Sequence, residues 1–240
     1  RRGVDTFTVA ATIGALHAAA EFSTDFGEHD RASRYREGAA RMTAAMRRHM
    51  WSDSEKRFAR NLVPQPDGTY KADMAADSAN YALFAFAGLP TTDPQVMGEI
   101  EAMRQRVTVR TPIGGYARYE HDYYHQIERT DIANVPGNPW AICTLWRAQF
   151  AIARAATVAE LSEAMDILQW CVARAEKSGV LAEQYHPYTG EAISVSPLTW
   201  SHATYVIVVV EYLKKLAQLQ QAAVGREASG STPIDPSHPP

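Results

Sequence analysis

Apolar residues recur with the spacing of α-helices in seven segments of the chain, and these segments alternate in character. Four segments are apolar nearly all round, whereas the three between them carry a single apolar stripe. The apolar segments are 5–23, 77–87, 139–155 and 199–221, and the amphipathic segments are 31–50, 94–107 and 157–175. Because a helix that is apolar on every side must be buried on every side, the alternation predicts an inner ring of helices backed by an outer ring.

The predicted fold is all-α and forms part of an α/α toroid. Seven helices do not close the usual twelve-helix barrel, and the chain begins abruptly at Arg1 without an initiator methionine. We therefore expect further helices to precede Arg1. Residues 1–221 are expected to form one domain, the C-terminal part of such a barrel. Residues 222–240 are rich in Gly, Ser and Pro and are expected to be a disordered tail.

Capping and turn residues mark the boundaries of several elements. A capping residue followed by proline opens two of the predicted helices, a capping box opens a third, and a Pro-Asp-Gly turn is expected between short strands. In chain order these signals are Pro66-Asp67-Gly68, Asp93-Pro94, Asn138-Pro139 and Thr157 to Glu160.

The composition excludes several classes of partner. Hydrophobic residues make up 46% of the chain and charged residues 21%, and the formal net charge is −3, which is typical of a globular protein. There is no basic stripe for nucleic acid and no apolar run long enough to span a membrane. Cys143 and Cys171 lie in predicted helices without CxxC spacing, so we expect buried free thiols, which favour a cytoplasmic location.

Two long loops, 108–137 and 178–198, each lead from an amphipathic helix into an apolar one. They are therefore expected to emerge at the same end of the barrel. Loops of this length in a compact domain are usually functional or disordered. Both are rich in Tyr, Trp, Arg and Glu, which favours a functional role.

The first loop has the side chains of a carbohydrate site. Arg118, Tyr119 and Asp122 lie close together, and Trp140 follows the loop. Aromatic rings stack on the apolar faces of sugars, while Arg and Asp bind paired hydroxyls. A solvated loop with a few core aromatics is the alternative. The pair His121 and His125 lacks the glutamate of a metalloprotease helix and lies in a loop, so no metal is expected, and no cofactor motif is present.

The second loop contains two carboxylates, Glu183 and Glu191. Glycoside hydrolysis with inversion uses a carboxylate that activates water and a protonated carboxyl about 6.5–9.5 Å away. Glu183 follows Leu181 and Ala182, and apolar surroundings would raise its pKa towards the useful range. Glu191 sits in a turn and is expected to be exposed. Glu183 is therefore the favoured general base, and Glu191 a structural acid.

Three blocks of sequence resemble glycoside hydrolase family 15, the glucoamylase and glucodextranase group. They are "GGYARYEHDYY" running to "GNPWAICTLW" at 114–146, "LAEQYHPYTGEAISVSPLTWSHATYV" at 181–206, and "RRGVDTFTVAA" at 1–11. The resemblance implies an (α/α)6 barrel and inverting, exo-acting hydrolysis of α-linked glucosides that releases β-glucose. The implied partner is an oligosaccharide or polysaccharide of the α-glucan class.

The resemblance also implies roles for individual residues. Glu183, in the Glu-Gln pair, matches the general base, and Arg118 matches the arginine that binds sugar in the −1 subsite. Aromatic pocket walls and nearby polar residues are implied at Trp140, Trp200, Tyr119 and Asp122.

The chain departs from the family pattern in two respects. The general acid of the family lies in a Trp-Glu-Glu motif that would come immediately before Arg1, so this chain alone is expected to be inactive. Residues 125–136 also make a longer gap than in fungal members, which affects pocket depth. The alternatives are an α-1,6-glucosidase, a glucodextranase or a trehalase of the same family, or a non-catalytic carbohydrate-binding helical module.

Overall fold

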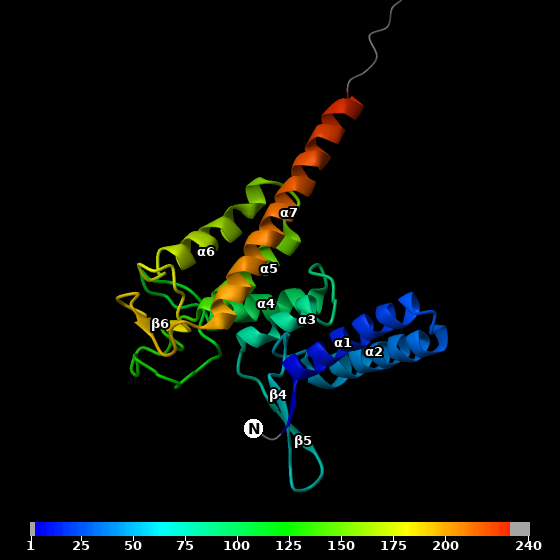
Figure 1. Cartoon of the computed structure of the whole chain (residues 1–240). Helices are drawn as coiled ribbons and strands as arrows, with labels where there is room; N and C mark the ends of the chain where they lie inside the picture. Colours follow the sequence, from blue (N-terminus) through cyan, green and yellow to red (C-terminus); the bar gives the residue numbers. More distant parts are fainter. Residues whose placement is uncertain (1–2, 231–240) are drawn as a thin grey trace, which may run out of the picture.

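The structure is a computed structural model that describes residues 3–230, with side chains described for residues 3–223 (Figure 1). The described part contains seven α-helices, two 3-10 helices and seven short strands. The α-helices are α1 Thr6–Asp25, α2 His29–Met50, α3 Ala82–Ala85, α4 Pro94–Arg106, α5 Ala141–Arg154, α6 Ser162–Val172 and α7 Thr199–Gly230, and the 3-10 helices are η1 Ser78–Tyr81 and η2 Ala159–Leu161.

Helix α5 lies between the two main hydrophobic clusters of the molecule. Its residues Cys143 and Trp146 belong to a core formed with α1, α2, α3 and α4, while Leu145 and Ala148 belong to a core formed with α6 and α7. Figure 1 shows α1 and α2 as a long antiparallel pair on one side and α5, α6 and α7 on the other. As predicted for an inner helix, α5 is buried on nearly every side.

The other apolar helices are not buried on every side, contrary to the sequence prediction. Phe22 of α1 is 68% exposed and Val206 of α7 is 60% exposed. Within the described residues, no element packs against these faces. The alternation of helix types thus predicts the layers correctly, but it does not show which helices are covered.

Short strands hold the loops between the helices. The expected turn at 66–68 joins β4 Asn61–Pro64 to β5 Tyr70–Asp73, and β1 Val4–Asp5 pairs with the other edge of β4. The start of the described chain is thereby attached to the 61–73 hairpin. The remaining pairs are β2 Trp51–Ser52 with β3 Arg57–Phe58, and β6 Gln184–Tyr185 with β7 Ala192–Ile193.

Three predicted boundaries differ from the structure. The segment 77–87 is a 3-10 turn followed by one α-helical turn, because the Ser78 hydroxyl donates to the Ala117 carbonyl and ties the segment to the first loop. Helix α5 starts at Ala141, since the Asn138 amide bonds other loop residues instead of capping the helix. Helix α7 continues to Gly230, past the predicted end at 221, and residues 231–240 of the predicted tail lie outside the described residues.

One capping signal is confirmed, and the capping box forms only in part. The Asp93 carboxylate accepts hydrogen bonds from the backbone N–H groups of Gln95 and Val96 at the start of α4. At the box, the Thr157 hydroxyl accepts from the Glu160 N–H, but the Glu160 carboxylate accepts from the Ala156 N–H instead of the Thr157 N–H. Within the described residues, no helix combines the length and apolarity needed to cross a bilayer.

Candidate active site

Backbone hydrogen bonds join the two long loops at the position of Glu183. The Ala141 N–H donates to the Glu183 carbonyl at 3.1 Å, and the Tyr185 N–H donates to the Pro139 carbonyl at 3.0 Å. Trp140 and Gln184 form a β-bridge between these two bonds. We call residues 139–141 and 183–185 the loop clamp. It confirms that both loops emerge at one end of the helices, and it places Glu183 beside Trp140.

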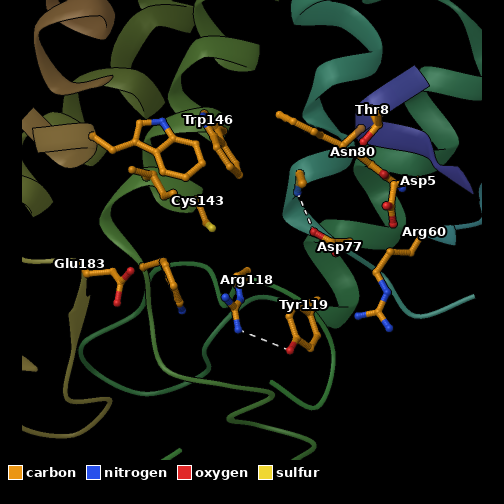
Figure 2. A pocket seen from close by; sticks show the side chains of 15 residues that line it. Asp5, Thr8, Arg60, Asp77, Asn80, Arg118, Tyr119, Cys143, Trp146 and Glu183 are labelled. Carbon is orange, nitrogen blue, oxygen red and sulfur yellow. Dashed lines mark hydrogen bonds between the residues drawn. The ribbon is translucent and has the colours of Figure 1, made fainter. Parts of the chain in front are cut away.

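A cavity of about 580 Å³ opens at the clamp, a volume within the usual range of ligand pockets, about 300–1,000 Å³. Five of the six residues predicted for the site line it: Arg118, Tyr119, Trp140, Glu183 and Trp200. In Figure 2, Glu183 lies on one side of the cavity, Asp5 and Arg60 lie on the other, and Arg118 lies between them. The structure thus brings residues from both loops, from the start of the described chain and from the start of α7 to one cavity.

The Glu183 carboxylate is held through one of its two oxygens. Oε2 accepts hydrogen bonds from the Ser194 hydroxyl and, at 3.2 Å, from the Gln184 amide. Oε1 accepts none from the described residues. The side chain is half-buried and lines the cavity, so one oxygen is fixed and the other is available to a ligand or to water.

Arg118 is held by Asp122 and stacked among aromatic rings. Its Nε and Nη2 donate to the Asp122 carboxylate at 2.9 and 2.8 Å, and its guanidinium lies 4.6 Å from the Trp140 ring and 4.8 Å from the Tyr119 ring. Although partial burial acts to lower the pKa of Arg118, the Asp122 carboxylate raises it. Gly137 allows this packing, because a Cβ there would lie 3.0 Å from the Asp122 Cβ.

Asp122 therefore has a different place from the one predicted. It is 1% exposed and does not line the cavity. Its carboxylate accepts from Arg118 and from the Tyr124 N–H, so it orients the Arg118 side chain without lining the cavity itself. Glu191 is exposed, lies outside the cavity lining, and accepts a hydrogen bond from Thr189.

Aromatic side chains form one wall of the cavity. Trp200 meets Trp146 edge to face, with ring centres 5.8 Å apart, and Trp146 stacks on Tyr81 at 4.2 Å. Trp200 is half-exposed, whereas Trp140 and Trp146 are buried. Such rings suit the apolar faces of a sugar. Trp146 was not singled out from the sequence, because it falls in a helix whose apolar residues all read as core.

The far side of the cavity contains polar residues that the sequence did not identify: Asp5, Thr8, Arg60, Asp77 and Asn80. They come from the start of the described chain, from the two-residue link between β3 and β4, and from η1 with the residue before it. Neither periodicity nor a familiar spacing connects these segments. The pairing of β1 with β4 brings Asp5 to the neighbourhood of Arg60, and the bridge between Asp77 and Tyr119 places η1 beside the first loop.

Two cysteines and two histidines were also singled out from the sequence. Cys143 and Cys171 are buried and free, as expected, and burial raises the pKa of Cys171 to about 12. His121 and His125 are exposed, and both have a positive φ. Among the described residues there is no group of three or more His, Cys, Asp or Glu side chains that could hold a metal ion.

The model of the family described as glycosyl hydrolases family 15 matches residues 1–210. The chain belongs to glycosyl hydrolase family 15. This membership confirms the resemblance found in the sequence.

This chain covers only part of the length of the relatives that it matches. An uncharacterized glycosyl hydrolase of Methanocaldococcus jannaschii is 24% identical over 221 residues, which are 88% of this chain and 33% of the relative. A glucoamylase of Clostridium sp. (strain G0005) is 23% identical over 227 residues, 86% of this chain and 32% of the relative. The chain thus spans about a third of the length of these relatives.

Solved structures support the fold. A bacterial glucoamylase complexed with acarbose matches with a TM-score of 0.74 and 21% identity, over 89% of this chain and 34% of that one. A glucoamylase of Saccharomycopsis fibuligera matches with a TM-score of 0.65 and 16% identity, over 89% and 56%. The prediction of an incomplete (α/α)6 barrel is confirmed.

Proposed function

We propose that this chain carries the general base and the principal sugar-binding arginine of an inverting α-glucosidase of the glucoamylase type. The observation that supports this most is the Glu183 carboxylate, fixed at Oε2 and unoccupied at Oε1, in one cavity with Arg118 and tryptophan rings. A carboxylate held in this way can orient a water molecule and take its proton as the water attacks the anomeric carbon.

The other lining residues then bind the glucosyl ring. Arg118 donates to ring hydroxyls with Nη1, the nitrogen that Asp122 leaves free, and its orientation is fixed before the substrate arrives. Trp140 and Trp200 lie against the apolar faces of the ring. Attack by water on the face opposite the departing oxygen gives β-glucose as the first product.

The general acid is expected outside this chain. The cavity holds two further carboxylates, Asp5 and Asp77. Asp5 accepts a hydrogen bond from the Asn61 amide at 2.7 Å, and Asp77 accepts one from the Ala79 N–H at 2.9 Å. We assign the acid to neither of them, and propose an acid located before Arg1, as the family resemblance implies.

The test uses the full-length protein that contains this chain, with maltose as substrate. Glu183→Gln is expected to lower kcat by about 10²- to 10⁴-fold, the usual contribution of a general base. Glu191→Gln is the matched control, because Glu191 is exposed and outside the cavity, and it is expected to retain full activity. Near-normal turnover by Glu183→Gln, or α-glucose as the first product in ¹H NMR, would contradict the proposal.

The linkage is a separate question for the same experiment. Maltose, isomaltose, trehalose and dextran compared side by side distinguish glucoamylase, glucodextranase and trehalase activities. Binding of these sugars by full-length protein that releases no glucose from any of them would support a carbohydrate-binding module instead. We expect maltose and longer α-1,4 oligosaccharides to be the best substrates.

A further inference from the structure

Arg60 occupies the side of the cavity away from Glu183 (Figure 2). Its backbone is fixed at the junction of the small sheet, since its N–H donates to the Asp73 carbonyl and its carbonyl accepts from the Thr6 N–H. Its side chain is mostly buried and pairs with the Asp73 carboxylate. The position of this cation is therefore set by β4, β5 and the start of α1.

The Arg60 guanidinium has hydrogen-bonding capacity that the described residues do not use. Nε and Nη2 each donate once to Asp73 Oδ2, which leaves the second N–H of Nη2 without a partner among the described residues, and Nη1 is covered by protein atoms and is also unpaired. Leaving a buried donor of a charged group unpaired is costly. The guanidinium also lies 4.7 Å from the centre of the Tyr119 ring, which Arg118 approaches at 4.8 Å.

The charges around Arg60 indicate a neutral polar ligand. Asp73 pairs with it directly, and Asp5 and Asp77 line the same side of the cavity. These carboxylates offset the positive charge, so an anionic ligand would gain little. Donors and acceptors placed side by side suit sugar hydroxyls, which both donate and accept.

The stereochemistry of inversion decides which sugar ring lies on this side. In an inverting hydrolysis the water held by the base attacks one face of the ring, and the leaving group departs from the opposite face. With Glu183 as base, the departing ring therefore lies on the side of the cavity away from Glu183. That side is lined by Arg60, Asp5 and Asp77.

We propose that Arg60 is a specificity-determining residue that binds hydroxyls of the departing sugar ring, beside Tyr119 and Asp77. The proposal rests on the inverting function proposed above. It predicts that Arg60 acts on substrates with a sugar leaving group and has no effect on a glucosyl donor whose leaving group is a single atom.

The test compares maltose with α-glucosyl fluoride on the full-length protein. Hydrogen bonds to charged groups contribute about 1.5–3 kcal/mol, so Arg60→Gln is expected to lower kcat/KM for maltose by about 10- to 100-fold. The value for α-glucosyl fluoride is expected to stay within about twofold. Arg60→Lys retains a cation for Asp73 but has no planar fork, and it is expected to show the same selective loss.

A control variant separates ligand binding from stability. Arg47→Gln breaks an ion pair with Asp93, and neither residue lines the cavity. This variant is not expected to change the ratio of the two substrates. An equal loss on both substrates in the Arg60 variants, or no loss on maltose, would overturn the proposal. Glu183→Gln tests the proposed function separately, because it is expected to abolish hydrolysis of both substrates.

Discussion

Ser194 has a backbone conformation that few residues other than glycine adopt, with φ of 66°. Such a conformation costs on the order of 1–3 kcal/mol in a non-glycine residue. From it the hydroxyl donates to Glu183 Oε2, while the neighbouring Val195 carbonyl accepts from the Glu183 N–H at 2.9 Å. The loop thus holds Glu183, the base that we propose, by its side chain and by its backbone.

Removing this hydroxyl is expected to impair the chemical step. Ser194→Ala leaves the base held at Oε2 by Gln184 alone, so we expect kcat on maltose to fall about 10-fold, as for loss of one charged hydrogen bond, with little change in KM. Ser194→Gly is expected to lose the same activity but to unfold at a higher temperature than Ser194→Ala, because glycine tolerates the positive φ.

Ser196→Ala provides the matched control for Ser194. Its hydroxyl donates to exposed Glu176 and not to Glu183. Steady-state kinetics and thermal unfolding on the four proteins check the prediction. Unchanged kcat in both Ser194 variants would show that Ser194 does not position the base.

Sequence reasoning found the residues of the site that lie in recognisable loops. Glu183 and Arg118 could be predicted because they lie among aromatic residues in two long loops at one end of the barrel, a setting that suits sugar binding. Arg60 and Asp77 could not be predicted. The strands and the 3-10 turn that place them are too short to show a hydrophobic periodicity. Ser194 was missed because its role depends on φ, which the sequence does not reveal.

At the scale of elements, helix α4 carries a carboxylate on its buried face. Glu99 is fully buried and accepts hydrogen bonds from the Phe58 N–H at 2.6 Å and from the Asn80 amide at 2.9 Å. Burial raises the pKa of Glu99 to about 7, although these bonds and the nearby Arg57 act to lower it. Asn80 lines the cavity, so α4 supports the site through Glu99.

This carboxylate gives the protein a pH-dependent stability. Because the pKa of Glu99 is higher in the folded protein, its contribution is fully present below pH 4.5, the unfolded value, and is lost as the pH rises towards 7. We expect the free energy of unfolding from this group to fall by at most about 1.4 kcal/mol per pH unit in that window. Urea unfolding at several pH values measures the slope.

Substitution on α4 checks this prediction. Glu99→Gln cannot ionise and is expected to flatten the slope between pH 4.5 and 7. Glu101→Gln, on the exposed side of α4, is the control, because Arg104 lowers the pKa of Glu101 to about 2 and moves its titration below that window. The same slope in Glu99→Gln and in the unmodified protein would contradict the prediction.

Element boundaries were predicted well where the signal was local. Asp93 caps α4 as its sequence indicates, because the cap is formed by the next residues in the chain. Asn138 is likewise a capping residue followed by proline, but its side-chain amide donates to the His125 carbonyl and to the Gln184 amide oxygen instead. A partner 46 residues away, such as Gln184, competes successfully with the local cap and cannot be read from the signal itself.

At the scale of the whole molecule, the alternation of helix types predicted the layers but not their coverage. The sequence indicates that α1 and α7 are apolar all round, yet each exposes apolar side chains in the structure. On α7 these are Val206, Ile207, Val210 and Leu213. Periodicity shows that a face must be covered, while the identity of the covering element depends on chain topology.

This α7 face is expected to make the 240-residue chain self-associate. Contiguous exposed apolar surface favours association, and burying a valine contributes about 1.5–3 kcal/mol. Sedimentation velocity over a range of concentrations is expected to show oligomers. The double variant Val206→Lys and Val210→Lys is expected to weaken association at least about 10-fold.

The control for this prediction adds the same charge elsewhere on the helix. Gln218→Lys with Gln220→Lys changes two exposed polar positions of α7 and leaves the apolar face intact. It is expected to associate as the unmodified chain does. Equal weakening by both pairs would indicate that charge alone, and not the apolar face, governs association.

The loop clamp has a consequence for protein engineering. Because the backbones of 139–141 and 183–185 are hydrogen-bonded to each other, the first loop cannot be exchanged with a relative without altering the edge that holds Glu183. A chimera with a crossover between residues 142 and 178 would take Arg118 and residues 139–141 from one parent but Glu183 and residues 183–185 from the other, so the two hydrogen-bonded edges would not match. The two loops should therefore be transplanted together, as one cassette, when a new linkage specificity is sought.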